Sequence, residues 1–172
     1  MIGRAVIAVL PFFLRYRMKT AFTMIELVFI IVVLGILAVV VVPRLAPVLD
    51  DANFAKGKDT VMSLRTAIAQ ERRKNVLQGE VKFPQILDDA SYSGTPQASQ
   101  ELFDGNATVT ILQYPIISKL SSGGWVKTSS NGAITQYRYY VTSSDFVDFN
   151  YTKQTGIFDC NHNDDDCKRL TE

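Results

Sequence analysis

The longest apolar run of the chain covers residues 22–42, where only Thr23 and Glu26 carry polar side chains. As a helix, these 21 residues would be about 31 Å long. That length is close to the hydrocarbon core of a bilayer, about 30 Å thick. The run therefore predicts a helix that inserts into a membrane.

Beyond the apolar run, residues 44–78 have the three- and four-residue spacing of an amphipathic helix. Gly79 suits its C-cap, and the "ERRK" cluster at 71–74 suits the solvated end of a helix better than a phosphate site. We expect one helix over residues 22–78, about 85 Å long. Its first stripe consists of Leu45, Val48, Leu49, Ala52 and Ala55, and the second stripe, for a sheet to cover, of Phe54, Val61, Leu64 and Ile68.

The rest of the chain changes from loop-forming sequence to strand patterns. Residues 80–107 are rich in turn formers and are expected to be irregular. Asn131-Gly132 predicts a hairpin, and in 145–152 apolar and polar residues alternate. The predicted fold class is α+β, a long N-terminal helix packed on a small antiparallel sheet. The expected strands are 108–112, 124–128, 133–142, 145–152 and 156–160.

Charge is distributed unevenly along the chain, although the formal net charge is only +1. Residues 1–79 carry 11 Lys+Arg against 5 Asp+Glu, whereas residues 80–172 carry 7 against 12. The acidic C-terminal half disfavours direct nucleic-acid binding, which depends on clustered cations. Basic residues gather before the apolar run, so the N-terminus is expected in the cytoplasm and the C-terminal part outside.

Glu26 is the unusual residue of the apolar run, because a carboxylate inside a membrane is costly unless it is paired. A cut between Ala21 and Phe22 would create a cationic α-amino group four residues away, on the same face of a helix. A neighbouring copy could supply that amine instead and so set the register between packed subunits.

At these residues the chain resembles the type IV pilins and the pseudopilins of type II secretion. The resemblance rests on "AFTMIELVFIIVVLGILA", with basic residues before Phe22, then Glu26, Gly35 and Pro43. It is close from residue 18 to about residue 46, and the plan of a long helix followed by a sheet agrees over the rest.

The resemblance implies processing by a membrane-embedded prepilin peptidase, which cuts before Phe22 and methylates the new amine. It makes Glu26 the assembly carboxylate, and implies that the helix can unwind around Gly35 and Pro43. A Pro-tolerant membrane helix with a small packing residue explains those two positions equally well. Ala21 stands where the family usually has glycine, so we expect slower cleavage or a matching enzyme.

The resemblance also implies a division of the chain and a set of partners. Residues 1–21 would be a cytoplasmic leader, with the true start at Met18 as the simplest reading. Residues 22–43 would be the transmembrane and assembly helix, 44–79 an amphipathic helix and 80–172 a periplasmic β-rich head. The implied partners are further copies and other pseudopilins, the prepilin peptidase, an inner-membrane platform protein and its assembly ATPase.

The expected function is that of a structural subunit of a secretion or competence-type pseudopilus, which leaves the inner membrane for a periplasmic or cell-surface filament. Protein secretion and DNA uptake both remain open, as does a type IV pilus for adhesion or motility. A plain membrane anchor carrying a periplasmic binding module is the rival, but it does not explain Glu26. A secretory signal lacks a good cleavage site after the run. No catalytic constellation appears, so we do not expect an enzyme.

The C-terminal sequence "DCNHNDDDCKRL" holds both cysteines, Cys160 and Cys167. Outside the cytoplasm they are expected to form a disulfide, which makes zinc binding with His162 the weaker interpretation. The loop also matches the first half of a calcium loop, although Asp164 replaces its glycine and Leu170 its final glutamate. The candidate calcium ligands, weighed against a solvated acidic loop, are Asp159, Asn161, Asn163, Asp164, Asp165 and Asp166.

Overall fold

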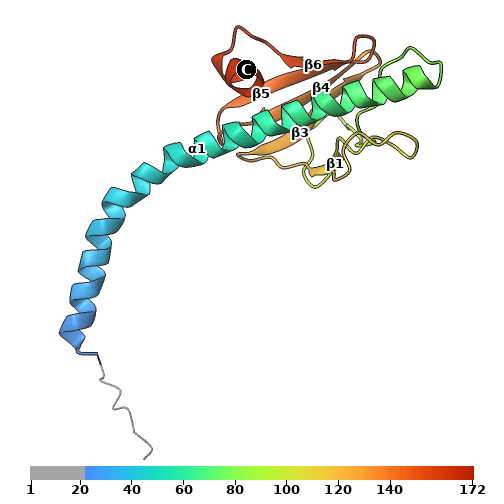
Figure 1. The fold of residues 1–172 in the computed structure, drawn as a ribbon. Coiled ribbons are helices and arrows are strands. Elements are labelled where there is room, and N and C mark those ends of the chain that lie inside the picture. The colour runs from blue at the N-terminus through green and yellow to red at the C-terminus, as the bar shows by residue number, and fades with distance from the viewer. Residues whose placement is uncertain (1–21) are drawn as a thin grey trace, which may run out of the picture. The chain divides into compact units, whose positions relative to one another are not determined.

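A computed structural model describes residues 22–172, apart from the side chains of Pro43, Leu45 and Ala46. The predicted leader, with Met18 and Ala21, lies outside the described residues. The chain divides into two compact units, Met1–Pro43 and Arg44–Glu172, called here the N-terminal and C-terminal units. Helix α1 (Met24–Leu77) contributes to both, and all other elements belong to the C-terminal unit (Figure 1).

The C-terminal unit has the predicted α+β architecture. Its main sheet is an antiparallel meander of four strands in the order β3-β4-β5-β6, and a second sheet pairs β1 with β2. The part of α1 in this unit crosses the main sheet (Figure 1). The strands are β1 (Glu101–Leu102), β2 (Ile116–Ile117), β3 (Gly124–Asn131), β4 (Ile134–Tyr140), β5 (Phe146–Thr152) and β6 (Ile157–Cys160), followed by helix α2 (Asp165–Thr171).

The second stripe of the predicted helix is the face of α1 that packs on the sheet. All four of its residues are buried in the core, and Val61 and Leu64 have no exposed surface. From the first stripe, Val48 and Leu49 are 61% and 65% exposed. Burial thus follows the second stripe, as expected, because only its side chains face the aromatic residues of the sheet.

Aromatic side chains fill the space between α1 and the sheet. Trp125, Tyr137 and Tyr139 are almost fully buried, and the Trp125 and Tyr139 rings lie 4.8 Å apart. Phe149 and Phe158 stack at 5.2 Å with nearly parallel rings. These residues pack the core, and their contacts contribute beyond the area that they bury.

Gly57 allows α1 to approach the sheet closely. A Cβ atom at this position would lie 2.5 Å from Cε1 of Tyr139 and 2.7 Å from Cδ2 of Leu170. The Tyr139 hydroxyl also donates a 2.5 Å hydrogen bond to the Asn53 carbonyl, so this ring has little freedom to move.

We therefore expect Gly57→Ala to lower the free energy of unfolding by about 1–3 kcal/mol, in spite of alanine's better helix propensity. Denaturant unfolding measures the change. Gly35→Ala is the matched control within α1, since nothing lies within 4 Å of its added Cβ. Equal stability of the Gly57→Ala protein would contradict the close packing described here.

The C-terminus of α1 confirms the predicted role of Gly79, which adopts a φ of +85°. Its N–H donates to the Val76 carbonyl at 3.0 Å, and the Glu80 N–H donates to the Asn75 carbonyl at 2.9 Å. This pair of bonds is a Schellman motif, which satisfies carbonyls that the helix itself leaves free. Of the basic cluster, Arg72, Arg73 and Lys74 are exposed, whereas Glu71 is buried.

Several predicted strands are confirmed and one is wrong. The hairpin at Asn131-Gly132 joins β3 to β4, and the alternation predicted for 145–152 appears as buried Val147, Phe149 and Tyr151 in β5. Residues 108–112 form no strand. They form the isolated bridge between Gly105 and Thr110, where Gly105 and Asn106 turn the chain back on itself.

Candidate functional site

The candidate assembly segment lies at the start of α1. Phe22 and Thr23 precede the first helical residue, Met24, so the helix begins two residues later than predicted. Phe22 is 71% exposed and Glu26 is also exposed. Because Phe22 is outside the helix, helical spacing does not place its backbone nitrogen beside the Glu26 carboxylate of the same copy.

Thr23 caps this helix, a role that the sequence analysis missed. Its hydroxyl accepts a hydrogen bond of 3.3 Å from the N–H of Glu26, three residues on. Threonine followed three residues later by glutamate is the sequence signature of a capping box. A carboxylate in the first turn of a helix is also favoured by the helix dipole. The first turn of α1 is therefore a favourable position for the Glu26 carboxylate, apart from any role in assembly.

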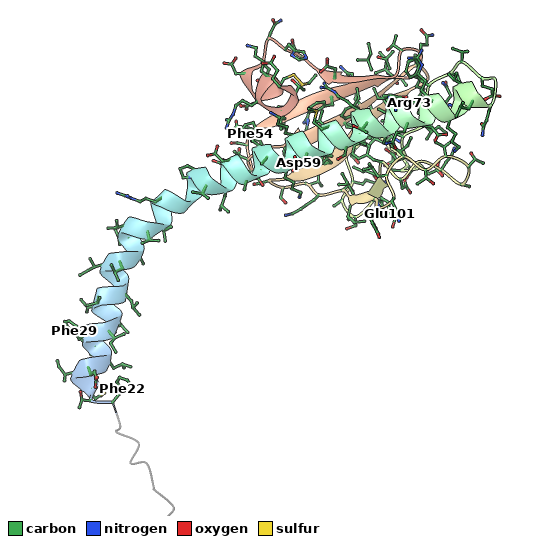
Figure 2. The ribbon with its side chains drawn as sticks, viewed as in Figure 1. Phe22, Phe29, Phe54, Asp59, Arg73 and Glu101 are labelled. Atoms are coloured by element: carbon green, nitrogen blue, oxygen red, sulfur yellow. A yellow bond between two sulfur atoms is a disulfide. The ribbon has the colours of Figure 1, made fainter. Side chains whose placement is uncertain are left out.

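The rest of this segment is an apolar helix with no packing partner among the residues that the structure describes. Met24–Val42 is long and apolar enough to cross a membrane, and none of it is buried. Phe22 and Phe29 project from the ribbon in Figure 2, and Phe29 is 68% exposed. A helix of this kind near the N-terminus can serve as a membrane anchor or as a signal sequence.

Gly35 and Pro43 both lie inside α1, which continues through them without a break in its helical assignment. No atom outside the local helix backbone lies within 4 Å of a Cβ placed on Gly35. Pro43 has no N–H, so the helix lacks one backbone hydrogen bond at this turn. Unwinding of this region in a filament stays a prediction.

The predicted disulfide between Cys160 and Cys167 is present, and it ties the end of β6 to helix α2. Cys167 is fully buried, and Leu170 from the next turn of α2 enters the core beside it. Helix α2 was not predicted, because the sequence of this stretch resembles part of a calcium loop.

Removing the disulfide by Cys160→Ser with Cys167→Ser is expected to lower the free energy of unfolding by about 2–3 kcal/mol, the chain-entropy value for so short a loop. Denaturant unfolding of the double variant, with and without reductant, measures the effect. The native protein should be less stable in reductant, and the variant should lose this sensitivity. A native protein equally stable in reductant would contradict this expectation.

The candidate calcium ligands take part in other local interactions. Asp159 accepts from Arg65 at 2.9 Å and lies 3.0 Å from Nε2 of His162. The Asn161 side chain accepts from the N–H of Asn163 at 3.1 Å. Disulfide bonding also leaves no thiolate of Cys160 or Cys167 for zinc.

The three aspartates that complete the set belong to the start of α2. Asp164 is its N-cap and accepts from the N–H of Asp166, while Asp165 pairs with Lys168 at 2.9 Å. That pairing lowers the pKa of Asp165, whereas burial and then the charge of Asp164 raise the pKa of Asp166. Calcium binding by this loop stays a prediction.

A buried ionic cluster, which the sequence analysis did not identify, holds the loop before β1 to the sheet. Lys127 on β3 and Tyr137 on β4 are paired in register, and both reach Asp88. The Lys127 ammonium lies 2.8 Å from one carboxylate oxygen, and the Tyr137 hydroxyl donates to the other at 2.5 Å. Burial, and then the Asp88 charge, raises the pKa of Tyr137 well above its ordinary value.

This cluster is a structural site rather than a catalytic one. The Asp88 side chain is fully buried and that of Lys127 is 7% exposed, so a substrate has little access to either group. The remaining bonds are local, since Lys127 also donates to the Ala90 carbonyl and Asp88 accepts from the Ala90 N–H.

Comparison with models of known protein families, with curated proteins and with solved structures finds no match to this chain.

Proposed function

We propose that the chain is a structural subunit of a secretion or competence-type pseudopilus. In this proposal a prepilin peptidase cuts between Ala21 and Phe22, the new amine is methylated, and the apolar helices of many copies pack into a filament. Assembly then requires an inner-membrane platform protein and its ATPase. The precursor sits in the inner membrane with residues 44–172 on the periplasmic side.

The observation that carries this proposal is an exposed carboxylate in an apolar helix that none of the residues 22–172 covers. Glu26 lies in the first turn of α1, and no residue of Met24–Val42 is buried. Outside water, that carboxylate needs a cation. Since Phe22 lies before the helix, a neighbouring copy is the better source of the α-amino group. Pairing between copies would fix their axial register.

A membrane anchor for a periplasmic binding module is the alternative, and the cap at Thr23 gives Glu26 a place in it. As the third helical residue after a threonine cap, Glu26 matches the pattern of a capping box, whether or not the chain is cut. A type IV pilus subunit is a further alternative. It would differ from a pseudopilus subunit in the filament that it forms, and the chemistry proposed for this segment would be the same.

Intact mass and N-terminal sequencing of the protein from its native membranes test the proposal. The expected result is a chain that begins at N-methylated Phe22. A chain that begins at Met1 or Met18 would overturn the proposal and favour the permanent anchor. A chain cut after the apolar run would identify the segment as a secretory signal.

A further inference from the structure

The C-terminal part of α1 forms one wall of an open groove of about 670 Å³. Apolar side chains, including Ile68, Val76 and Phe83, line this groove. Arg65, Arg72 and Arg73 line it as well, so a partner must combine apolar surface with negative charge. We call this feature the basic groove, and Figure 2 shows Arg73 on this part of α1.

The positive charge of the basic groove is only partly used within the chain. Arg65 forms an ion pair with Asp159 at 2.9 Å. The Arg72 guanidinium lies over the Phe83 ring at 4.5 Å. Among the described residues, neither Arg72 nor Arg73 forms an ion pair, although both are exposed.

Acidic side chains gather elsewhere on the C-terminal unit. Asp145 lies in the turn between β4 and β5, and Asp164, Asp165 and Asp166 lie at the start of α2. Asp166 is close enough to the other three for their charges to raise its pKa, after the larger effect of burial. We call these four residues the acidic end.

The acidic end keeps a surplus of negative charge and has an apolar neighbour. Two cations offset part of the negative charge. Lys168 pairs with Asp165 at 2.9 Å, and Arg169 lies 4.0 Å from Asp166. Phe146, next to Asp145, is 43% exposed, and the Arg138 guanidinium lies over one face of its ring at 3.6 Å. This surface therefore combines negative charge with exposed apolar area, as the basic groove requires.

The part of the basic groove around Arg72 and Arg73 lies far from the acidic end along α1. Helix α2 is held beside the beginning of this stretch of α1, because Arg169 pairs with Asp51 at 3.2 Å and lies over the Phe54 ring at 3.5 Å. The basic groove surrounds Arg72 near the other end of the helix. At 1.5 Å per residue, Asp51 and Arg72 are separated by about 32 Å along α1.

We propose that the basic groove of one copy binds the acidic end of a second copy, in a head-to-tail contact between C-terminal units. The inference rests on the proposed function, because it names a contact between subunits of the same filament. Two different surfaces of one chain form a heterologous interface, which continues into a fibre unless its rotation closes a ring. Copies joined in this way are displaced by about 32 Å along α1.

Zero-length cross-linking tests the contact in the full chain in its native membranes. Arg73→Lys keeps the charge and supplies an amine, which a carbodiimide joins to a carboxylate that touches it. We expect a cross-link between Lys at 73 and Asp164, Asp165 or Asp166. Along α1, residue 73 lies about 33 Å from Asp51, beside which α2 is held, so such a link joins two copies. The exposed Lys119 of the same protein is the internal control, expected to give at least tenfold less of this link.

Charge reversal supplies a second measurement that does not depend on filaments. Arg72→Glu with Arg73→Glu, or Asp165→Lys with Asp166→Lys, should each reduce co-purification of tagged with untagged full chain in detergent roughly tenfold. Mixing the two variants should restore co-purification to within about threefold of the native level. Lys119→Glu is the control of equal chemistry, and thermal unfolding checks that each variant folds.

The possible outcomes separate this contact from the proposed function. Absence of the link from residue 73, or failure of the mixed variants to restore association, overturns the head-to-tail contact. If the chain begins at methylated Phe22 and forms filaments all the same, only this inference fails. If the link and the restoration appear on an uncut chain, the contact stands and the proposed processing fails.

Discussion

Replacing Glu26 by alanine is expected to reduce sedimentable filaments by a factor of ten or more, without lowering the amount of folded protein in the membrane. A hydrogen bond to a charged group contributes about 1.5–3 kcal/mol, and 1.4 kcal/mol corresponds to a factor of ten in an equilibrium constant. The loss repeats at every subunit of a polymer. Quantitative sedimentation and electron microscopy of filaments from native cells measure the effect.

Two further variants separate pairing between copies from helix capping. Glu26→Gln retains a side chain that can complete a capping box but carries no charge, so under the proposed function it should fail like alanine. Thr23→Val removes the hydroxyl that accepts from Glu26 and keeps the carboxylate, so it should assemble more nearly like the native chain. The reverse pattern would show that Glu26 acts in assembly through the start of the helix rather than through its charge.

The largest loss of stability is expected from Asp88→Ala. This change leaves the ammonium of Lys127 buried without its counter-ion, and the Tyr137 hydroxyl without its acceptor. Removing one partner of a buried ion pair costs about 3–5 kcal/mol, because the other charge stays in a low-dielectric site. Denaturant unfolding gives the free energy directly.

The controls for Asp88→Ala come from the same sheet. Asp148→Ala removes the partner of Arg138 in a partly exposed pair at 2.7 Å, where the expected loss is about 0–1 kcal/mol. Asp88→Ala with Lys127→Met should be less unstable than Asp88→Ala alone, since no unpaired charge remains. A single variant as stable as Asp148→Ala would show that water reaches the Lys127 ammonium.

The long-range plan of the fold could be predicted from the sequence because it depends on periodicity. The stripe from Phe54 to Ile68 predicted the buried face of α1, and the alternation through Val147, Phe149 and Tyr151 predicted the buried face of β5. Each pattern spans several repeats, so a single residue that departs from it does not obscure the periodicity.

Elements that depend on distant contacts were missed. The pairing of β1 with β2 involves two residues on each strand, which is too short for a visible pattern. The burial of Asp88 requires Lys127 and Tyr137, which are far from it in sequence. Helix α2 has only seven residues, and its acidic first turn resembles a metal-binding loop. By contrast, the cap at Thr23 was visible in the sequence as Thr-x-x-Glu.

The hydrogen bonds of that cap involve no residue before Thr23. Thr23 supplies both the hydroxyl that receives the Glu26 N–H and the carbonyl that receives the Leu27 N–H at 3.2 Å. Both groups remain if the chain is cut before Phe22. Loss of the leader therefore leaves the first helical turn with its hydrogen bonds, and the same helix can exist before and after processing. A cut before Phe22 would then change the charge at the N-terminal end of α1 without changing the helix.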